Sequence, residues 1–290
     1  MALDLARTCL LSLTVLIAAA CAARAPLPAA CADAAAGRRT ISVVAHRGWL
    51  APTHVENSLR EMKAAVRAGV GVLEIDLRAS RDGTLFLLHD ATLDRTTTGA
   101  GRIDASTDAQ LAGVTLKGLD GRSTGEPLPR FDDVLAWVEL EPGVQLMLDI
   151  KGVDLQALVQ TLVRRGLDSR SIILTFDDAT TTALLGPAHQ AIVSVLVKTP
   201  GDIARYAALA RGHRMALYVA QNAEVSLYDA ANATGLPIVS DAIMASPAGT
   251  LDDRAARDGA QVYREHLATR PVRYFVSNHP VEARAAVCAF

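Results

Sequence analysis

The sequence is poor in cysteine, in aromatic residues and in excess charge of either sign. Only four cysteines occur in 290 residues, and three of them precede residue 32, so we expect neither a disulfide framework nor a thiolate metal site. The net charge of −2 gives no basic stripe of the kind that binds nucleic acid. Aromatic residues make up 4%, which predicts no apolar rim for a lipid substrate.

Long apolar runs are also absent, except near the N-terminus. No later stretch approaches the roughly 20 apolar residues of a membrane span. Arg7 precedes an apolar run and then small residues, a pattern typical of a secretory signal. We therefore predict that residues 1–37 are an export leader and linker, and that the protein is periplasmic or secreted. Two routes of processing remain open. The leader is cleaved at Ala23-Arg24-Ala25 or Ala32-Asp33-Ala34, or it is processed as a lipoprotein with a lipid anchor on Cys21. The alternative is an N-terminal tail on a cytosolic protein.

Residues 38–290 alternate short apolar runs with amphipathic stretches, which predicts a single α/β domain. Strands that alternate with helices form parallel sheets with right-handed crossovers, and eight such units close into a (β/α)8 TIM barrel. No Gly-x-Gly-x-x-Gly follows the first strand, which disfavours the alternative, an open doubly wound sheet. The eight expected strands are Ile41–Ala45, Val72–Leu77, Val144–Ile150, Ile172–Phe176, Ile192–Val197, Met215–Val219, Pro237–Ser240 and Val272–Val276, with Leu85–Leu88 as a hairpin partner of the second.

Local signals place several helices and one insertion. Ser58 followed by Glu61 is a capping box, and Asp154 caps a later amphipathic helix. A long alanine-rich helix is expected over about Leu251 to Ala268. The stretch from about 90 to 129 is polar and without periodicity, and too long for an idle loop in a compact domain. We expect it to be functional or a small subdomain.

Two carboxylates share one face of the second strand. Residues two apart in a strand point the same way, so Glu74 and Asp76 face one side while their apolar neighbours face the other. Two such carboxylates repel unless a cation lies between them, and oxygen ligands suit Mg²⁺ or Ca²⁺. Histidines and an arginine follow neighbouring strands, which indicates chemistry on a phosphate. The alternative is a charged face on an edge strand.

A series of short motifs resembles the glycerophosphodiester phosphodiesterase family. The motifs occur in the family's order over roughly a fifth of the chain, and they read His46-Arg47-Gly48, Glu56-Asn57, Glu74-Ile75-Asp76, Asp82-Gly83, His89-Asp90, Arg95-Thr96-Thr97 and Gly99. The family's fold is the same barrel, with an insertion after the second barrel strand. The resemblance implies metal-dependent hydrolysis of glycerophosphodiesters to glycerol 3-phosphate and an alcohol.

The resemblance also implies roles for individual residues. His46 and His89 correspond to the catalytic acid and base, and Arg47 and Lys151 to substrate contacts. Glu74, Asp76 and Asp149 correspond to the ligands of one divalent cation, Mg²⁺ or Ca²⁺. For Asn57 we favour a simpler role as a helix cap over substrate contact.

Four positions depart from the family pattern. Asp149 stands where Glu is usual, and Val55 where Pro is common. The last strand ends in Ser277-Asn278-His279-Pro280 rather than Thr-Asp-x-Pro. The family's tryptophan near the seventh strand is missing, and Tyr218 is the candidate to replace it.

Two other functions remain as alternatives. One is a phospholipase C-like or D-like phosphodiesterase on the same barrel, which needs an apolar rim. The other is a non-catalytic periplasmic binding protein, for which two histidines are superfluous. We expect a small glycerophosphodiester as partner and no nucleic acid.

Overall fold

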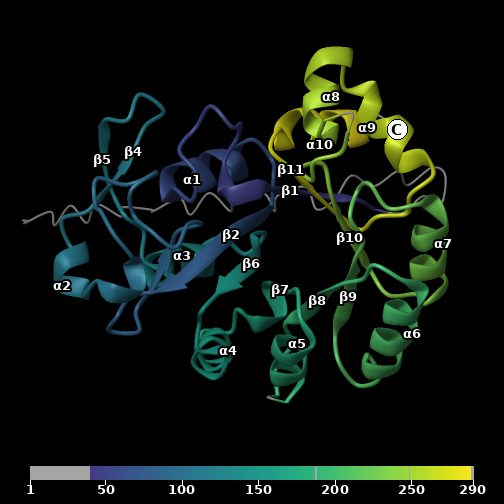
Figure 1. Cartoon of the computed structure of the whole chain (residues 1–290), viewed down its shortest axis with the longest axis horizontal. Helices are drawn as coiled ribbons and strands as arrows, with labels where there is room; N and C mark the ends of the chain where they lie inside the picture. The colour runs from purple at the N-terminus through teal and green to yellow at the C-terminus, as the bar shows by residue number, and fades with distance from the viewer. Residues whose placement is uncertain (1–39, 187, 248, 289–290) are drawn as a thin grey trace, which may run out of the picture.

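The computed structural model describes residues 40–186, 188–247 and 249–288, and these residues form an eight-stranded parallel barrel surrounded by helices (Figure 1). The expected leader, with Cys21 and its cleavage sites, lies outside the described residues. The elements follow in this order: β1 Ser42–Ala45, η1 His46–Gly48, α1 Leu59–Arg67, β2 Val72–Ala79, β3 Leu85–Leu87, η2 Ile103–Ala105, α2 Asp108–Leu111, β4 Thr115–Lys117, β5 Ser123–Pro127, α3 Phe131–Glu139, β6 Gln145–Lys151, α4 Leu155–Arg164, η3 Asp168–Arg170, β7 Ser171–Thr175, α5 Asp178–Leu185, β8 Ile192–Leu196, α6 Pro200–Leu209, β9 Met215–Tyr218, α7 Val225–Ala233, β10 Ile238–Asp241, α8 Leu251–Asp258, α9 Gln261–Ala268, β11 Tyr274–Ser277 and α10 Pro280–Cys288.

The barrel closes between its first and last strands. The strand order is β1-β11-β10-β9-β8-β7-β6-β2, and β1 also pairs with β2 in parallel. The predicted TIM barrel is confirmed, and the alternative prediction of an open doubly wound sheet is wrong. The short strand β3 adds to the barrel in antiparallel pairing with the far end of β2, as expected of a hairpin partner.

Alternating burial explains why these strands form a barrel. One set of side chains packs outward against the helices, and a second set fills the barrel interior, including Val44, Met147, Ile172, Ala216 and Val239. Packing on both faces suits the apolar runs seen in the sequence. Most of the polar residues of the strands lie toward the strand ends, where the loops begin.

Residues 90–129 form a small unit beside the barrel (Figure 1). It contains η2, α2 and the β4–β5 hairpin, and its apolar side chains make a separate cluster with Phe86 and Leu88. Glu126 on β5 accepts hydrogen bonds from the Ser58 hydroxyl (2.7 Å) and the Arg60 amide (3.1 Å). The unit is thereby attached to the start of α1.

One expectation about the C-terminal part is wrong, and another needs comment. The alanine-rich stretch forms two helices, α8 and α9, because Gly259 between them adopts a left-handed conformation with φ 97°. Cys288 is disulfide-bonded, and one such bond does not amount to the disulfide framework that we expected the sequence to lack.

Within the described part of the chain, every helix is too short or too polar to cross a membrane.

Candidate active site

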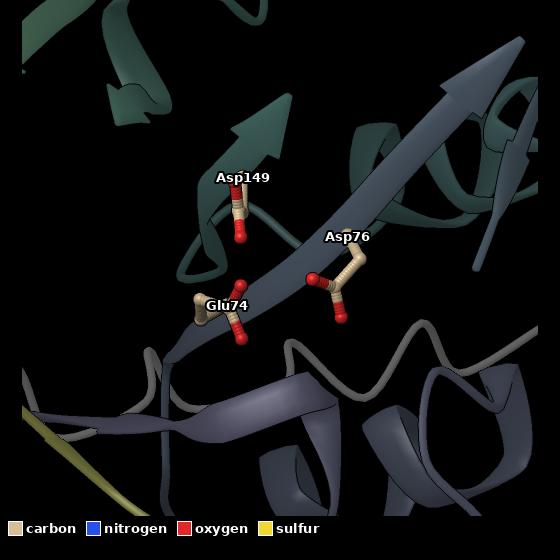
Figure 2. Close-up of side chains that lie close together, drawn as sticks. All are labelled: Glu74, Asp76 and Asp149. Atoms are coloured by element: carbon tan, nitrogen blue, oxygen red, sulfur yellow. The ribbon is translucent and has the colours of Figure 1, made fainter. Parts of the chain in front are cut away.

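Three carboxylates meet at the carboxyl end of the barrel. Glu74 and Asp76 project from β2, and Asp149 projects from the neighbouring β6, where it pairs in register with Asp76 (Figure 2). One oxygen from each residue lies within 4.8 Å of the others. The spacing predicted for the second strand therefore brings both of its carboxylates to one place, and Asp149 joins them there.

The alternation along β2 produces this arrangement. Leu73, Ile75 and Leu77 are fully buried against the surrounding helices, which leaves the intervening side chains pointing into the barrel mouth. β2 has a parallel partner on each side, so the alternative of an edge strand with a charged face is wrong. Glu74 and Asp76 are themselves buried, at 3% and 1% exposure.

The buried carboxylates destabilise one another's charged form. Burial, Asp76 and Asp149 raise the pKa of Glu74 well above its usual range. Burial also raises the pKa of Asp149. Burial also acts to raise the pKa of Asp76. The charge of Lys151 and the hydrogen bonds from Lys151 and Asn57 outweigh burial, so the pKa of Asp76 is lowered. The negative charge of the cluster is therefore incompletely compensated, and most of all at Glu74.

Lys151 supplies part of that positive charge. Its ammonium group contacts Asp76 and donates to Asp149 Oδ2 (2.7 Å). Three carboxylates against one ammonium leave two negative charges, which a divalent cation balances. Three carboxylate oxygens are a donor set that Mg²⁺ and Ca²⁺ prefer, so the residues present fit such an ion.

A tight turn after β1 brings His46 and Arg47 to the cluster. Arg47 and Gly48 both have left-handed backbones, with φ 52° and 66°. A side chain at Gly48 would place its Cβ 2.4 Å from Met62 Cγ, so only glycine fits. The turn points the Arg47 amide at Glu74 Oε2, to which it donates (2.7 Å).

His46 lies beside the cluster with 15% of its side chain exposed. Its Nδ1 contacts Asn278 Oδ1 (2.7 Å), and its Nε2 lies 3.9 Å from Glu74 Oε2. Burial lowers its pKa to about 4, although the hydrogen bond to Asn278 acts in the opposite direction. The imidazole is therefore neutral at neutral pH and can accept a proton.

A chain of ion pairs connects Arg47 to His89. Arg47 donates to Glu56 (2.8 Å), and Arg95 binds both oxygens of Glu56 (2.8 Å each) while it also binds both oxygens of Asp90 (2.6 and 3.0 Å). Asp90 in turn contacts His89 Nδ1 (2.8 Å). Two arginines and two carboxylates balance within this chain, and Arg47 Nε also lies 4.0 Å from Asp76 Oδ2, so the chain touches the carboxylate cluster at Asp76 and not at Glu74. The Arg47 Nε is buried without a hydrogen-bond partner among the described residues.

His89 follows β3, and the residue before it is bonded to β2, since Leu88 N donates to Asp76 O (3.1 Å). Its side chain is 37% exposed, compared with 15% for His46. The two histidines therefore follow different strands, and His89 is the more exposed of the two.

Asn57 does not cap α1, so our expectation for it is wrong. Ser58 is the cap, and its hydroxyl accepts from Glu61 N. Asn57 has a left-handed backbone (φ 54°), and its amide donates to Asp76 Oδ2 (2.8 Å) and accepts from Asp76 N (3.1 Å). It therefore holds the Asp76 carboxylate in place.

The last predicted position is Tyr218, the candidate to replace the family's tryptophan. Tyr218 is buried, and its hydroxyl donates to Asp241 (3.0 Å), so it packs within the barrel mouth.

Phe176 after β7 and Met244 after β10 are 53% and 43% exposed. The expectation of no apolar rim is thus too strict, since two large apolar side chains follow strands at this end.

Sequence reasoning missed the roles of Asn57, Arg95 and Asn278. All three stand within or beside the motifs quoted above, and Asn278 was noticed only as a departure. Their partners lie 19, 39 and 232 residues away in the chain, and spacing along a single strand gives no signal for such contacts.

The chain resembles one family along most of its length. The sequence profile of the glycerophosphoryl diester phosphodiesterase family matches residues 46–263. A probable glycerophosphodiester phosphodiesterase 1 of Mycobacterium tuberculosis is 46% identical over 69 residues, which is 24% of this chain and 25% of that protein. A glycerophosphodiester phosphodiesterase of Caldanaerobacter subterraneus is 28% identical over 148 residues, 47% of this chain and 58% of that protein. The matches thus span less than two thirds of these relatives.

Solved structures agree with the observed fold. A glycerophosphoryl diester phosphodiesterase from Parabacteroides distasonis has a TM-score of 0.73 at 23% identity, with 88% of each chain covered. A phosphodiesterase from Oleispira antarctica, solved with the product sn-glycerol-3-phosphate, has a TM-score of 0.66 at 20% identity, with 85% of this chain and 96% of that chain covered. At these identities the likeness supports the barrel fold.

Proposed function

The chain belongs to the glycerophosphoryl diester phosphodiesterase family, and from this membership and its site we propose that it hydrolyses glycerophosphodiesters to glycerol 3-phosphate and an alcohol. The observation that carries the proposal is the carboxylate cluster at the barrel mouth, with His46 Nε2 3.9 Å from Glu74 Oε2. A non-catalytic binding protein needs a cation and an arginine to hold a phosphodiester. It does not need a neutral histidine beside the cation site.

We propose that Glu74, Asp76 and Asp149 hold one divalent cation, Mg²⁺ or Ca²⁺. When bound, such an ion offsets the negative charge of the substrate phosphate and the further negative charge that develops on its oxygens during the reaction. Lys151 holds two of the three carboxylates and leaves Glu74 as the least compensated one. Whether Lys151 also contacts the phosphate stays a prediction.

His46 and His89 share the proton transfers. The neutral His46 Nε2 accepts the proton of the glycerol 2-hydroxyl, and the hydroxyl oxygen forms a bond to phosphorus. His89 donates a proton to the departing alkoxide as its bond to phosphorus breaks, which releases the alcohol and a cyclic 1,2-phosphate. Arg47 contacts the phosphate oxygens.

Water then opens the cyclic ester with the histidine roles reversed. His89, now neutral, accepts a proton from water, and the imidazolium of His46 returns its proton to the 2-oxygen. The product is glycerol 3-phosphate, and both histidines regain their starting states. The 2-hydroxyl is favoured as nucleophile because it is held next to phosphorus in the same molecule. No serine or cysteine of the sequence stands in a nucleophile motif.

The first experiment measures glycerophosphocholine cleavage with and without EDTA. We expect cleavage that EDTA abolishes and that added Mg²⁺ or Ca²⁺ restores. A 2-deoxy analogue should bind yet turn over very slowly. Rapid cleavage of that analogue would contradict the cyclic intermediate and point to direct attack by water.

A phospholipase-like reaction is the second candidate, because Phe176 and Met244 are exposed at the strand ends. Lysophosphatidylcholine, which carries one acyl chain, distinguishes the two. If it is cleaved faster than glycerophosphocholine, the preferred substrate is a lipid.

We also propose that the protein is exported. Mass spectrometry of the extracellular or periplasmic protein should find the leader missing. A diacylated Cys21 would select the lipoprotein form, and an intact Met1 would contradict export.

A further inference from the structure

The contact between His46 and Asn278 joins the first barrel strand to the last. β1 and β11 pair in parallel with Ala45 opposite Ser277, so the residues that follow both strands leave the barrel side by side. His46 Nδ1 and Asn278 Oδ1 lie 2.7 Å apart although 232 residues separate them in the chain. An amide oxygen only accepts hydrogen bonds, so Nδ1 carries the imidazole proton. The lone pair of the neutral ring is therefore on Nε2.

Nε2 faces the carboxylate cluster. It lies 3.9 Å from Glu74 Oε2, on the side where the proposed substrate binds. Trp49 packs with its ring edge-on to the imidazole, with 6.1 Å between ring centroids and 84° between ring planes. Asn278 on one side and Trp49 on another restrict the rotation of the ring.

Asn278 is itself held by a buried carboxylate. Asp252, at the start of α8 and only 1% exposed, accepts hydrogen bonds from the backbone N–H of Asn278 (2.6 Å) and from the Ser277 hydroxyl (2.7 Å). It also accepts from the Tyr263 hydroxyl (2.8 Å). These bonds fix the backbone after β11 and do not involve the Asn278 side chain. The Asn278 side chain can therefore accept the hydrogen bond from His46 Nδ1.

We propose that Asn278 is a positioning residue that holds His46 in the tautomer with a free Nε2 and aims that nitrogen at the substrate. The inference rests on the proposed function, in which His46 Nε2 accepts the first proton. The ring nitrogen that carries the proton is set by the hydrogen bond made by the other nitrogen. Loss of the Asn278 oxygen allows the proton to occupy either nitrogen and the ring to turn.

The first test does not depend on activity. Nitrogen-15 NMR of the imidazole rings distinguishes a protonated from an unprotonated ring nitrogen, and His46→Gln identifies the His46 signals. In the unmodified protein we expect a protonated Nδ1 and an unprotonated Nε2. Asn278→Ala and the equally large Asn278→Leu should give averaged or exchanged signals, whereas Asn278→Asp keeps the acceptor and should keep the pattern.

His279→Ala is the matched control, since it changes the next residue and leaves the Asn278 side chain in place. It should leave the His46 signals unchanged. If Asn278→Ala and Asn278→Leu both keep the signals of the unmodified protein, Asn278 does not set the tautomer and the proposal is overturned. Because the backbone contacts to Asp252 persist, we expect the variants to fold, and two replacements of different size guard against a packing defect in either.

The second test measures steady-state kinetics with glycerophosphocholine. Asn278→Ala should lower kcat by roughly 100-fold, within the range typical of general-base catalysis, and leave KM nearly unchanged. Affinity for MgCl₂ or CaCl₂ alone should also be unchanged, because Asn278 does not touch the carboxylate cluster. Asn278→Asp should recover most of kcat.

The two proposals fail in different ways. An unmodified protein with the expected NMR pattern but no turnover contradicts the proposed function and supports the tautomer assignment. A normal kcat in Asn278→Ala, in a protein that cleaves the substrate, overturns the positioning role.

Discussion

At the scale of single residues, the carboxylate cluster depends on how its negative charge is compensated. Glu74 is buried with two neighbouring carboxylates, and Lys151 contacts only the other two. A bound divalent cation relieves this repulsion, so each carboxylate should contribute strongly to its affinity.

Asp149 tests this reasoning directly. Asp149→Asn removes one charge while it keeps the size of the side chain, and we expect affinity for Mg²⁺ or Ca²⁺ to fall by about 10-fold or more, with a parallel loss of activity. Asp149→Glu should retain binding, since it keeps the carboxylate. Calorimetry with the metal alone measures both. Asp133→Asn, on the exposed face of α3, is the control, and full affinity in Asp149→Asn would remove Asp149 from the set of ligands.

Asn57 should matter for the same site through Asp76. Asn57→Gly removes the amide but accepts the left-handed backbone, so we expect roughly 10- to 100-fold weaker metal binding or activity in a normally folded protein. Asn57→Ala should show the same loss plus a lower melting temperature. A fully active Asn57→Gly would mean that Asp76 needs no support.

At the scale of elements, the unit formed by residues 90–129 reaches the active site through Arg95. One guanidinium binds Glu56 and Asp90 with paired hydrogen bonds, and Asp90 contacts His89. Lysine cannot make paired bonds to two carboxylates at once. This geometry therefore makes the unit a support for His89.

We predict that Arg95→Lys lowers kcat by about 10-fold and that Arg95→Ala lowers it further, because His89 loses a fixed partner. Faster limited proteolysis within residues 90–129 should accompany the loss. Arg122→Lys, on an 88% exposed side chain in the same unit, should change neither measurement. Unaltered kcat in both Arg95 variants would separate the unit from catalysis.

The barrel elements were predictable because their signals are local. Apolar runs placed every barrel strand to within two residues at each end, and Ser58 and Asp154 cap the helices that they precede. The β4–β5 hairpin was not predictable, since its strand Ser123–Pro127 is polar and half exposed. The break at Gly259 was missed because the amphipathic pattern continues across it.

The site was predictable only in part for the same reason. The motifs supplied the strand-end residues, and the structure brings them together. Contacts such as Asn57 to Asp76 or Arg95 to Glu56 depend on where separate loops meet, and the sequence carries no periodic signal for that. Their roles in catalysis stay predictions.

At the scale of the whole molecule, partly buried neutral histidines should make the fold sensitive to acid. Burial lowers the pKa of His266 to about 4, and its Nε2 is buried without a hydrogen-bond partner among the described residues. Between pH 6.5 and 4 the unfolded chain binds a proton that the folded protein does not. Stability is therefore lost as the pH falls through this window.

We predict that His266→Gln flattens this dependence. The free energy of unfolding of the unmodified protein should fall on the order of 2 kcal/mol more than that of the variant from pH 6.5 to pH 4. Urea unfolding at several pH values measures the difference, and His46 contributes equally to both proteins. His213→Gln, at an exposed position, should follow the unmodified protein. Equal slopes for His266→Gln and the unmodified protein would contradict the burial argument.

The pairing of β1 with β11 has a consequence for biosynthesis. Most of the residues assigned to the site are already present when a ribosome has completed residue 151, but the acceptor for His46 Nδ1 is Asn278, which follows the last barrel strand. A chain that stops before β11 therefore carries all the proposed catalytic and metal-binding groups without the partner that orients His46. We expect nascent or truncated chains to remain inactive until the barrel closes, so that onset of phosphodiesterase activity reports the completed fold.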